Sequence, residues 1–178
     1  MKTRFGAERC IDAPALVVYH CLADYREHHR PGGFLPPAFE QLDIARGGVG
    51  AGTEYRFVMA VGGRRRAVST TVSEPVPGHK LVETGSGIET TFTVEQTVDG
   101  AHVQFDTVID QRGLQGILNR LFVARMLGPI YEDELRRLED HAKAHPVTLS
   151  FMASIGASAS QSAGPCCYRC PTGGSIAV

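Results

Sequence analysis

Residues 113–145 read GLQGILNRLFVARMLGPIYEDELRRLEDHAKAH, and this stretch is the most informative feature of the chain. Its apolar side chains recur at steps of three and four residues, which predicts one long amphipathic helix. Gly128-Pro129 lies within the pattern, and we expect a kink there because proline removes a backbone donor. The apolar stripe consists of Leu114, Ile117, Leu118, Leu121, Phe122, Met126, Ile130, Leu135 and Leu138.

The region before this helix changes to a period of two residues and is punctuated by turn residues. Alternating apolar and polar side chains predict strands with one buried face, and Gly62-Gly63 and Asp99-Gly100 are hairpin signals. We therefore expect a curved antiparallel sheet packed on the long helix. Its predicted strands span residues 53–61, 64–73, 80–84, 89–98 and 101–110.

The N-terminal residues predict further elements of both kinds. Residues 3–11 and 39–45 have the alternation of strands. Asp12 and Pro14 predict the start of a short helix, with Asp12 as its cap. A second short helix is expected at residues 24–29, before a Pro-Gly-Gly sequence that would end it.

Short motifs along the chain resemble the START-like helix-grip superfamily, also named SRPBCC. They match its strand-to-helix transition, the end of its first helix, its glycine-rich link and its central hairpin. The motifs are IDAPA (11–15), LADY (22–25), GGVGAGT (47–53), VSEP (72–75) and KLVE (80–83). The most similar subgroup is the small bacterial kind described as polyketide cyclase/dehydrase or lipid-transport-like.

This resemblance implies an α+β helix-grip fold for residues 1–145. In that fold an antiparallel sheet of about six to seven strands curves around a long C-terminal helix, and two short helices follow the first strand. Residues 146–178 would form a separate tail rich in Ser, Gly, Ala and Cys.

A sheet curved around one helix leaves space in which small apolar ligands bind. The resemblance implies a hydrophobic or aromatic, polyketide- or lipid-like ligand, with cofactor-free cyclisation or dehydration as a further expectation. The sequence leaves open whether the chain is an enzyme or a carrier, and it identifies no catalytic residue. The predicted lining residues are Tyr55, Phe57, Met59, Phe92, Val94, Phe105, Leu118 and Phe122.

Titratable side chains are densest around the expected second helix, where His20, Asp24, Tyr25, His28 and His29 occur together. Imidazole and carboxylate groups can act as general acid and base near neutral pH. We favour a solvated helix end with a buried Asp24 contact, because nothing in the sequence fixes these groups around a common point. Adjacent histidines point in different directions, so no metal ligand set is expected there.

Other polar side chains lie on the predicted strands and on the long helix. One polar atom in an apolar pocket can orient a ligand carbonyl or hydroxyl. Arg125 interrupts the apolar stripe and is interpreted as a surface arginine that extends towards solvent. The strand candidates are Tyr55, Ser69, Thr71, Thr91, Thr93 and Thr107, with Arg56 expected on the opposite face.

The composition argues against several classes of partner. A net charge of -1 gives no field to attract nucleic acid or an anionic membrane, and Arg64-Arg65-Arg66 is interpreted as a solvated hairpin shoulder. The first residues lack the apolar core of a signal peptide, and no stretch is long enough to cross a bilayer. We therefore expect a cytoplasmic protein without a cofactor or a bound metal.

The tail, residues 146–178, has Arg169 as its only charged residue. We expect it to be flexible, because its small side chains offer little apolar area to offset the entropy of ordering. Cys167 and Cys170 could join His141 and His145 as four zinc ligands, but an unstructured connection would have to close.

The same tail supports a hypothesis of a different class. Its Ser, Thr and Cys residues are typical of the core of a ribosomally made, modified peptide, in which dehydrated Ser and Thr accept cysteine thiolates. The folded domain would then be the leader that a modifying enzyme recognises. The sequence keeps this alternative beside the ligand-binding hypothesis.

Overall fold

The computed structural model describes residues 2–30, 33–61, 63–85, 87–110 and 115–145, excluding the side chains of residues 61, 64 and 115–126. The tail lies outside these ranges. Its expected flexibility, the zinc alternative through Cys167 and Cys170, and the modified-peptide hypothesis therefore stay predictions.

The described chain runs from one strand through a short helix and six strands to a long helix. β1 (Lys2–Ile11) precedes α1 (Ala15–Ala23), and α2 (Gln115–Ala144) is the last described element. Neither of these helices combines the length and apolar character needed to cross a membrane. The strands between them are β2 (Phe39–Arg46), β3 (Glu54–Val61), β4 (Arg64–Val76), β5 (Lys80–Gly85), β6 (Ile88–Thr97) and β7 (Gly100–Asp110).

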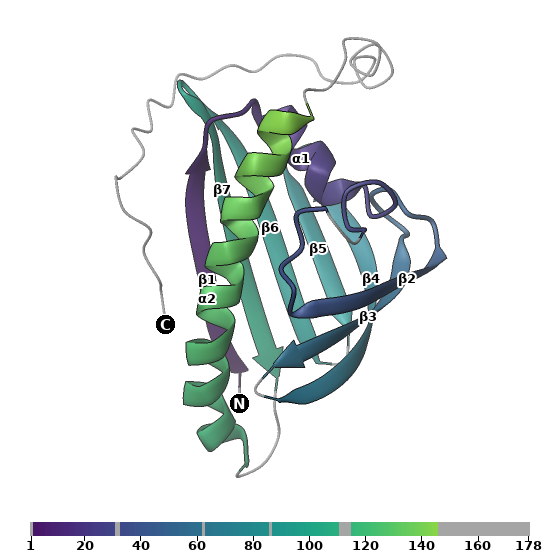
Figure 1. Cartoon of the computed structure of the whole chain (residues 1–178), viewed down its shortest axis with the longest axis vertical. Helices are drawn as coiled ribbons and strands as arrows, with labels where there is room; N and C mark the ends of the chain where they lie inside the picture. The colour runs from purple at the N-terminus through teal and green to yellow at the C-terminus, as the bar shows by residue number, and fades with distance from the viewer. Residues whose placement is uncertain (1, 31–32, 62, 86, 111–114, 146–178) are drawn as a thin grey trace.

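All strands form one antiparallel seven-stranded sheet in the order β1-β7-β6-β5-β4-β3-β2. From β2 to β7 each strand pairs with the next in the chain, and β1 joins the far side of β7. The sheet curves, and α2 lies across its concave face (Figure 1). The predicted α+β helix-grip fold is confirmed.

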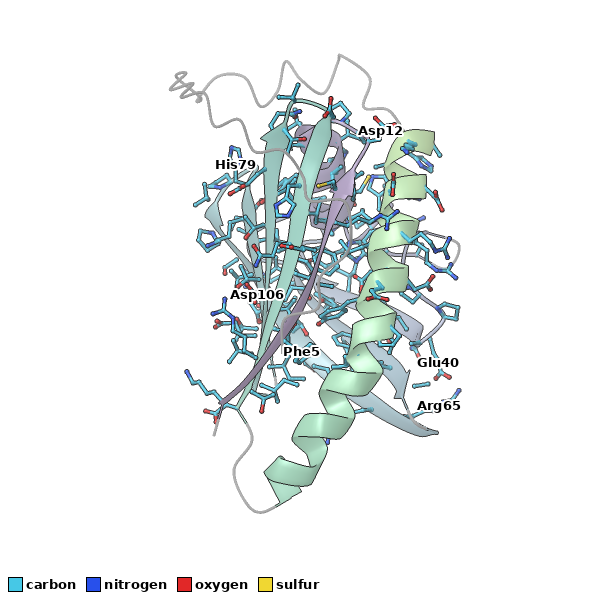
Figure 2. All side chains as sticks on the ribbon, turned by 90° about the vertical axis from the view of Figure 1, so that its left-hand side faces the viewer. Phe5, Asp12, Glu40, Arg65, His79 and Asp106 are labelled. Atoms are coloured by element: carbon cyan, nitrogen blue, oxygen red, sulfur yellow. The ribbon has the colours of Figure 1, made fainter. Side chains whose placement is uncertain are left out.

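The core lies between α2 and the concave face of the sheet. His79 and Asp106 lie on the side of the sheet away from α2 (Figure 2). Leu135 and Leu138, from the predicted stripe, are 1% and 0% exposed. The expected packing of Leu118, Leu121 and Phe122 on β6 concerns side chains outside the described set.

One strand is longer than the sequence predicts. β4 was expected to end before Pro75, yet it continues to Val76. Pairing with β5 shifts register between Ser73 and Val76, so Pro75 needs no ladder hydrogen bond. The predicted break is wrong because this irregularity accommodates proline within the strand.

The start of α1 differs from the expected capping by Asp12. Pro14 occupies the N-cap position without a side-chain hydrogen bond. The Ala15 N–H is instead accepted by Gln96 Oε1 at 2.9 Å, from the end of β6. Asp12 is exposed and lies 3.5 Å from the Lys143 ammonium group. Gln96 of β6 therefore caps α1 in place of Asp12.

This arrangement predicts unequal effects of two substitutions. Gln96→Ala should lower the free energy of unfolding by about 1 kcal/mol, because the first turn of α1 loses its acceptor. Asp12→Ala is the matched control and should change stability by less than about 0.5 kcal/mol. Urea unfolding of both variants checks the prediction, and a larger effect of Asp12→Ala would contradict it.

The second short helix expected at residues 24–29 is absent, and this prediction is wrong. The segment is a turn in which Asp24 Oδ1 accepts the backbone N–H groups of Arg26 and Glu27, at 2.9 and 3.0 Å. The Tyr25 N–H donates to the Gly48 carbonyl at 2.9 Å. Aspartate used in this way favours a turn over a helix.

The glycine-rich link holds this turn against the sheet. Gly48 has a φ of 126°, and a Cβ there would collide with the Arg26 side chain. Glycine allows the close backbone approach that places Tyr25 inside the domain.

Candidate functional site

The described members of the predicted lining set lie on the concave face of the sheet. Tyr55, Phe92, Val94 and Phe105 are buried in the core, and Phe57 packs half-buried against it. Met59 is also half-buried and follows Tyr55 and Phe57 with the same strand period. Leu118 and Phe122 belong to α2, but their side chains lie outside the described set. Their contact with a ligand stays a prediction.

Aromatic rings connect the sheet to α2. Phe92 and Phe105 meet edge to face with ring centroids 4.7 Å apart, and Phe105 lies 5.7 Å from Tyr131 of α2. On the other side of the interior, the Tyr25 ring lies 4.8 Å from the Tyr55 ring. These rings make the interior between the sheet and α2 apolar and aromatic.

Glu83 of β5 is the first polar group in these surroundings. The Tyr25 hydroxyl donates to Glu83 Oε1 at 2.6 Å, and the Tyr55 hydroxyl also hydrogen-bonds this carboxyl. Burial raises the pKa of Glu83, while both tyrosines oppose that shift. Burial also raises the pKa of Tyr25 and Tyr55 well above the usual value, so both hydroxyls keep their protons and donate.

Glu134 of α2 is the second polar group, on the same helix face as Tyr131 and Leu138. It is only 5% exposed, and burial followed by the charges of Glu83 and Asp133 raises its pKa to about 8. No residue in the described part of the chain forms a hydrogen bond with this carboxyl. Every fully enclosed polar side-chain atom among the described residues is paired. The Glu134 oxygens therefore border space that a water or ligand atom can reach.

A third set of polar atoms lies beside Glu134. Thr107 Oγ1 lies 2.9 Å from Thr90 Oγ1 and 2.7 Å from the Tyr131 hydroxyl, and all three groups are buried. Their hydrogen bonds are satisfied within the set. This set therefore fixes Tyr131, one helical turn from Glu134, and leaves Glu134 as the group in need of a partner.

The two carboxyl groups have different environments. Two tyrosine hydroxyls favour the charged form of Glu83, whereas Glu134 has no such donors and is mostly protonated at neutral pH. Pairs of titratable groups with separated pKa values are typical of acid–base sites. The arrangement can hold a proton donor and a proton acceptor in one apolar interior.

The sequence predicted only some of the polar side chains that face the interior. Thr107 is inside, and Arg56 is on the outer face, as predicted. Ser69 and Thr71 are exposed and therefore do not face the interior, which contains Thr70 instead. Thr91 and Thr93 alternate with the buried Thr90 and Phe92 and so belong to the outer face. Arg125 lies among the α2 side chains outside the described set.

Glu83 and Glu134 were missed, although the sequence carried a signal for both. Glu83 follows the buried Leu81 by two residues on β5, which places it on the same face. Glu134 lies three residues after Tyr131 and four before Leu138, within the apolar face of α2. A charged residue in register with a buried face is the pattern to recognise.

The histidine-rich segment after α1 is only partly as predicted. Asp24 is buried and makes the expected capping-type contact, but Tyr25 and His29 are buried as well, so the segment is not a solvated helix end. His28 and His29 point in different directions, as expected. His28 Nδ1 lies 2.8 Å from His141 Nε2, whereas His29 Nε2 donates to the Leu22 carbonyl at 3.0 Å.

Comparison with protein-family models identifies the family of this chain. A family model described as "Polyketide cyclase / dehydrase and lipid transport" matches residues 2–143. The chain belongs to this family. The START-like, polyketide cyclase/dehydrase resemblance read from the motifs is thereby confirmed. Comparison with curated proteins gives no significant match.

Solved structures show the same fold. The KanY protein, solved in solution, has a TM-score of 0.69 and 24% identity, covering 80% of this chain and 99% of that one. The di-domain ARO/CYC StfQ from the steffimycin biosynthetic pathway has a TM-score of 0.65 and 16% identity, covering 82% and 52%. TTHA0849 from Thermus thermophilus has a TM-score of 0.61 and 21% identity, covering 83% and 100%. At these identities the likeness supports the fold alone.

Proposed function

We propose that this protein binds a small hydrophobic or aromatic molecule, polyketide- or lipid-like, between α2 and the concave face of the sheet. We further propose that Glu83 and Glu134 contact the oxygen atoms of this molecule and support cofactor-free cyclisation or dehydration. The family description and the aromatic surroundings of the two carboxyls support this proposal.

The unpaired carboxyl of Glu134 carries the proposal. A buried polar group without a hydrogen bond is unfavourable by about 1–3 kcal/mol, and native proteins rarely keep one. Glu134 has no partner among the described residues, yet it lies on the inner face of α2. A ligand carbonyl or hydroxyl would supply the missing hydrogen bond.

The ionisation states suit the chemistry of carbonyl compounds. In an aldol cyclisation, the Glu83 carboxylate would accept a proton from the carbon beside one carbonyl. The resulting carbanion forms a bond to a second carbonyl carbon, and the protonated Glu134 gives its proton to that oxygen, which becomes a hydroxyl. Loss of the hydroxyl as water would complete a dehydration, with the two groups exchanging roles.

A competition assay with simple aromatic probes tests the binding site. The fluorescent apolar amine N-phenyl-1-naphthylamine should bind the protein and be displaced by 2-naphthol more effectively than by naphthalene. The preference for the hydroxyl should be about two- to tenfold, the range of one neutral hydrogen bond. Glu134→Leu should remove this preference while it retains binding of both probes.

Glu132 provides a matched control, because it lies exposed on the outer side of the same helical turn. Glu132→Leu should keep the preference for 2-naphthol. Failure of the wild-type protein to bind either probe would refute the binding proposal. An unchanged preference in Glu134→Leu would refute the role of Glu134.

A further inference from the structure

A second cluster of chemically active side chains lies at the C-terminal end of α2. The C-terminal turns of α2 lie beside α1 (Figure 1). Cys21 is in the last turn of α1, His28 is in the turn that follows, and His141 is in the last turn of α2. Three separate segments thus deliver a thiol and two imidazoles to one place.

The donor atoms of this cluster are close enough to share one ion. The Cys21 sulfur and one ring nitrogen each from His28 and His141 all lie within 4.8 Å of one another. His28 Nδ1 and His141 Nε2 are 2.8 Å apart. Tetrahedral zinc with ordinary bond lengths needs about 3.3 Å between two nitrogens and about 3.6 Å between nitrogen and sulfur. Small side-chain movements would meet these distances.

Further donors surround the same histidine. His20, Asp24 and His28 also offer ligand atoms within 4.8 Å of one another. The His20 and His28 rings meet edge to face with centroids 5.3 Å apart. His28 therefore belongs to both groups, and either His20 or Asp24 is near enough to supply a fourth ligand.

We propose that Cys21, His28 and His141 bind one zinc-type divalent transition-metal ion, with the fourth position taken by His20, Asp24 or water. A direct imidazole–imidazole hydrogen bond accounts for two of the three donors but not for the adjacent thiol. Thiolate and imidazole together are the ligands that zinc prefers. Cys21 is buried while His28 and His141 are partly exposed, so an ion can enter from the histidine side. The proposal differs from the sequence-based expectation of no metal and is independent of the proposed ligand.

A metal ion at this site would be connected to the interior through the turn from Asp24 to His29. The turn from Asp24 to His29 carries His28 towards α2 and Tyr25 towards Glu83. An ion on His28 and His141 would tie this turn to α2. Bound metal should therefore raise the melting temperature, as any ligand of the native state does.

Cobalt spectroscopy of the untagged full chain tests the proposal. After treatment with EDTA, the wild-type protein should bind one Co²⁺ per chain with a thiolate-to-cobalt charge-transfer band, and Zn²⁺ should displace it. His28→Gln and His141→Gln should each weaken binding at least about tenfold. Cys21→Ser should abolish the band. His102→Gln is the control, because His102 lies on β7 beside Glu8, outside the cluster.

The cysteines of the tail need a separate variant. Replacing Cys166, Cys167 and Cys170 together by serine should leave the charge-transfer band intact. Loss of the band in that variant, with retention in Cys21→Ser, would overturn the proposal, as would the absence of stoichiometric Co²⁺ binding to the wild-type chain. Thermal unfolding without metal shows which variants fold, and Cys21→Ala replaces Cys21→Ser if serine prevents folding.

Discussion

Replacing Glu134 by glutamine should make the protein more stable than the wild type at alkaline pH and leave it nearly unchanged at acidic pH. Glu134 has a folded-state pKa of about 8, against 4.5 for an ordinary glutamate. The contribution of protonated Glu134 to the free energy of unfolding is fully present below about pH 4.5. It is lost as the pH rises through 8, because the folded state must then bury a charge. The difference corresponds to at most roughly 5 kcal/mol, and contact with water would reduce it.

Urea unfolding of wild type and Glu134→Gln at several values between pH 5 and 9 measures this effect. The difference between the two proteins cancels the titration of other groups. Glu132→Gln, on the exposed side of the same helix, should show no comparable dependence on pH. If the wild type loses no free energy of unfolding relative to Glu134→Gln above pH 8, this carboxyl is not buried in its neutral form.

Replacing Tyr25 by phenylalanine should destabilise the protein by about 1.5–3 kcal/mol at pH 7. Its hydroxyl donates to Glu83 at 2.6 Å inside the domain, and hydrogen bonds to charged groups contribute in that range. The aromatic ring and its contacts with Tyr55 remain, so the loss reports on the hydroxyl. Removing this donor should also raise the pKa of Glu83 further.

A double-mutant cycle with Glu83→Gln separates the hydrogen bond from other effects. In the Glu83→Gln background, Tyr25→Phe should cost clearly less, because the charged acceptor is already gone. Equal destabilisation in both backgrounds would mean that the Tyr25 hydroxyl does not act through Glu83.

The sequence predicted the fold well because the fold depends on repeated local signals. The period-two alternation located the strands, and the stripe ending in Leu135 and Leu138 located α2. The errors occurred where a single side chain changed the local outcome. Asp24 accepts two backbone N–H groups and makes a turn in place of a helix, and Gln96 replaces Asp12 at the start of α1.

The candidate site was harder to predict because it depends on long-range contacts. Tyr55 was recognised from its strand alone, but its partner Glu83 comes from β5 and Tyr25 from the turn after α1. A glutamate is usually exposed, so its residue type alone did not make Glu83 or Glu134 a candidate for the interior. The proposed metal site likewise requires the C-terminal turns of α2 to lie beside α1, which no local pattern in the sequence predicts.

We propose that Glu83 and Glu134 form one ligand site between the sheet and α2. A ¹³C NMR titration of the glutamate side-chain carboxyls, with and without 2-naphthol, tests it most directly. We expect Glu134 to titrate near pH 8 in the free protein, and we expect 2-naphthol to shift the signals of Glu83 and Glu134 but not that of Glu132. Titration of Glu134 near its ordinary value of 4.5, with both signals unmoved by 2-naphthol, would show that the two carboxyls do not form a common ligand site.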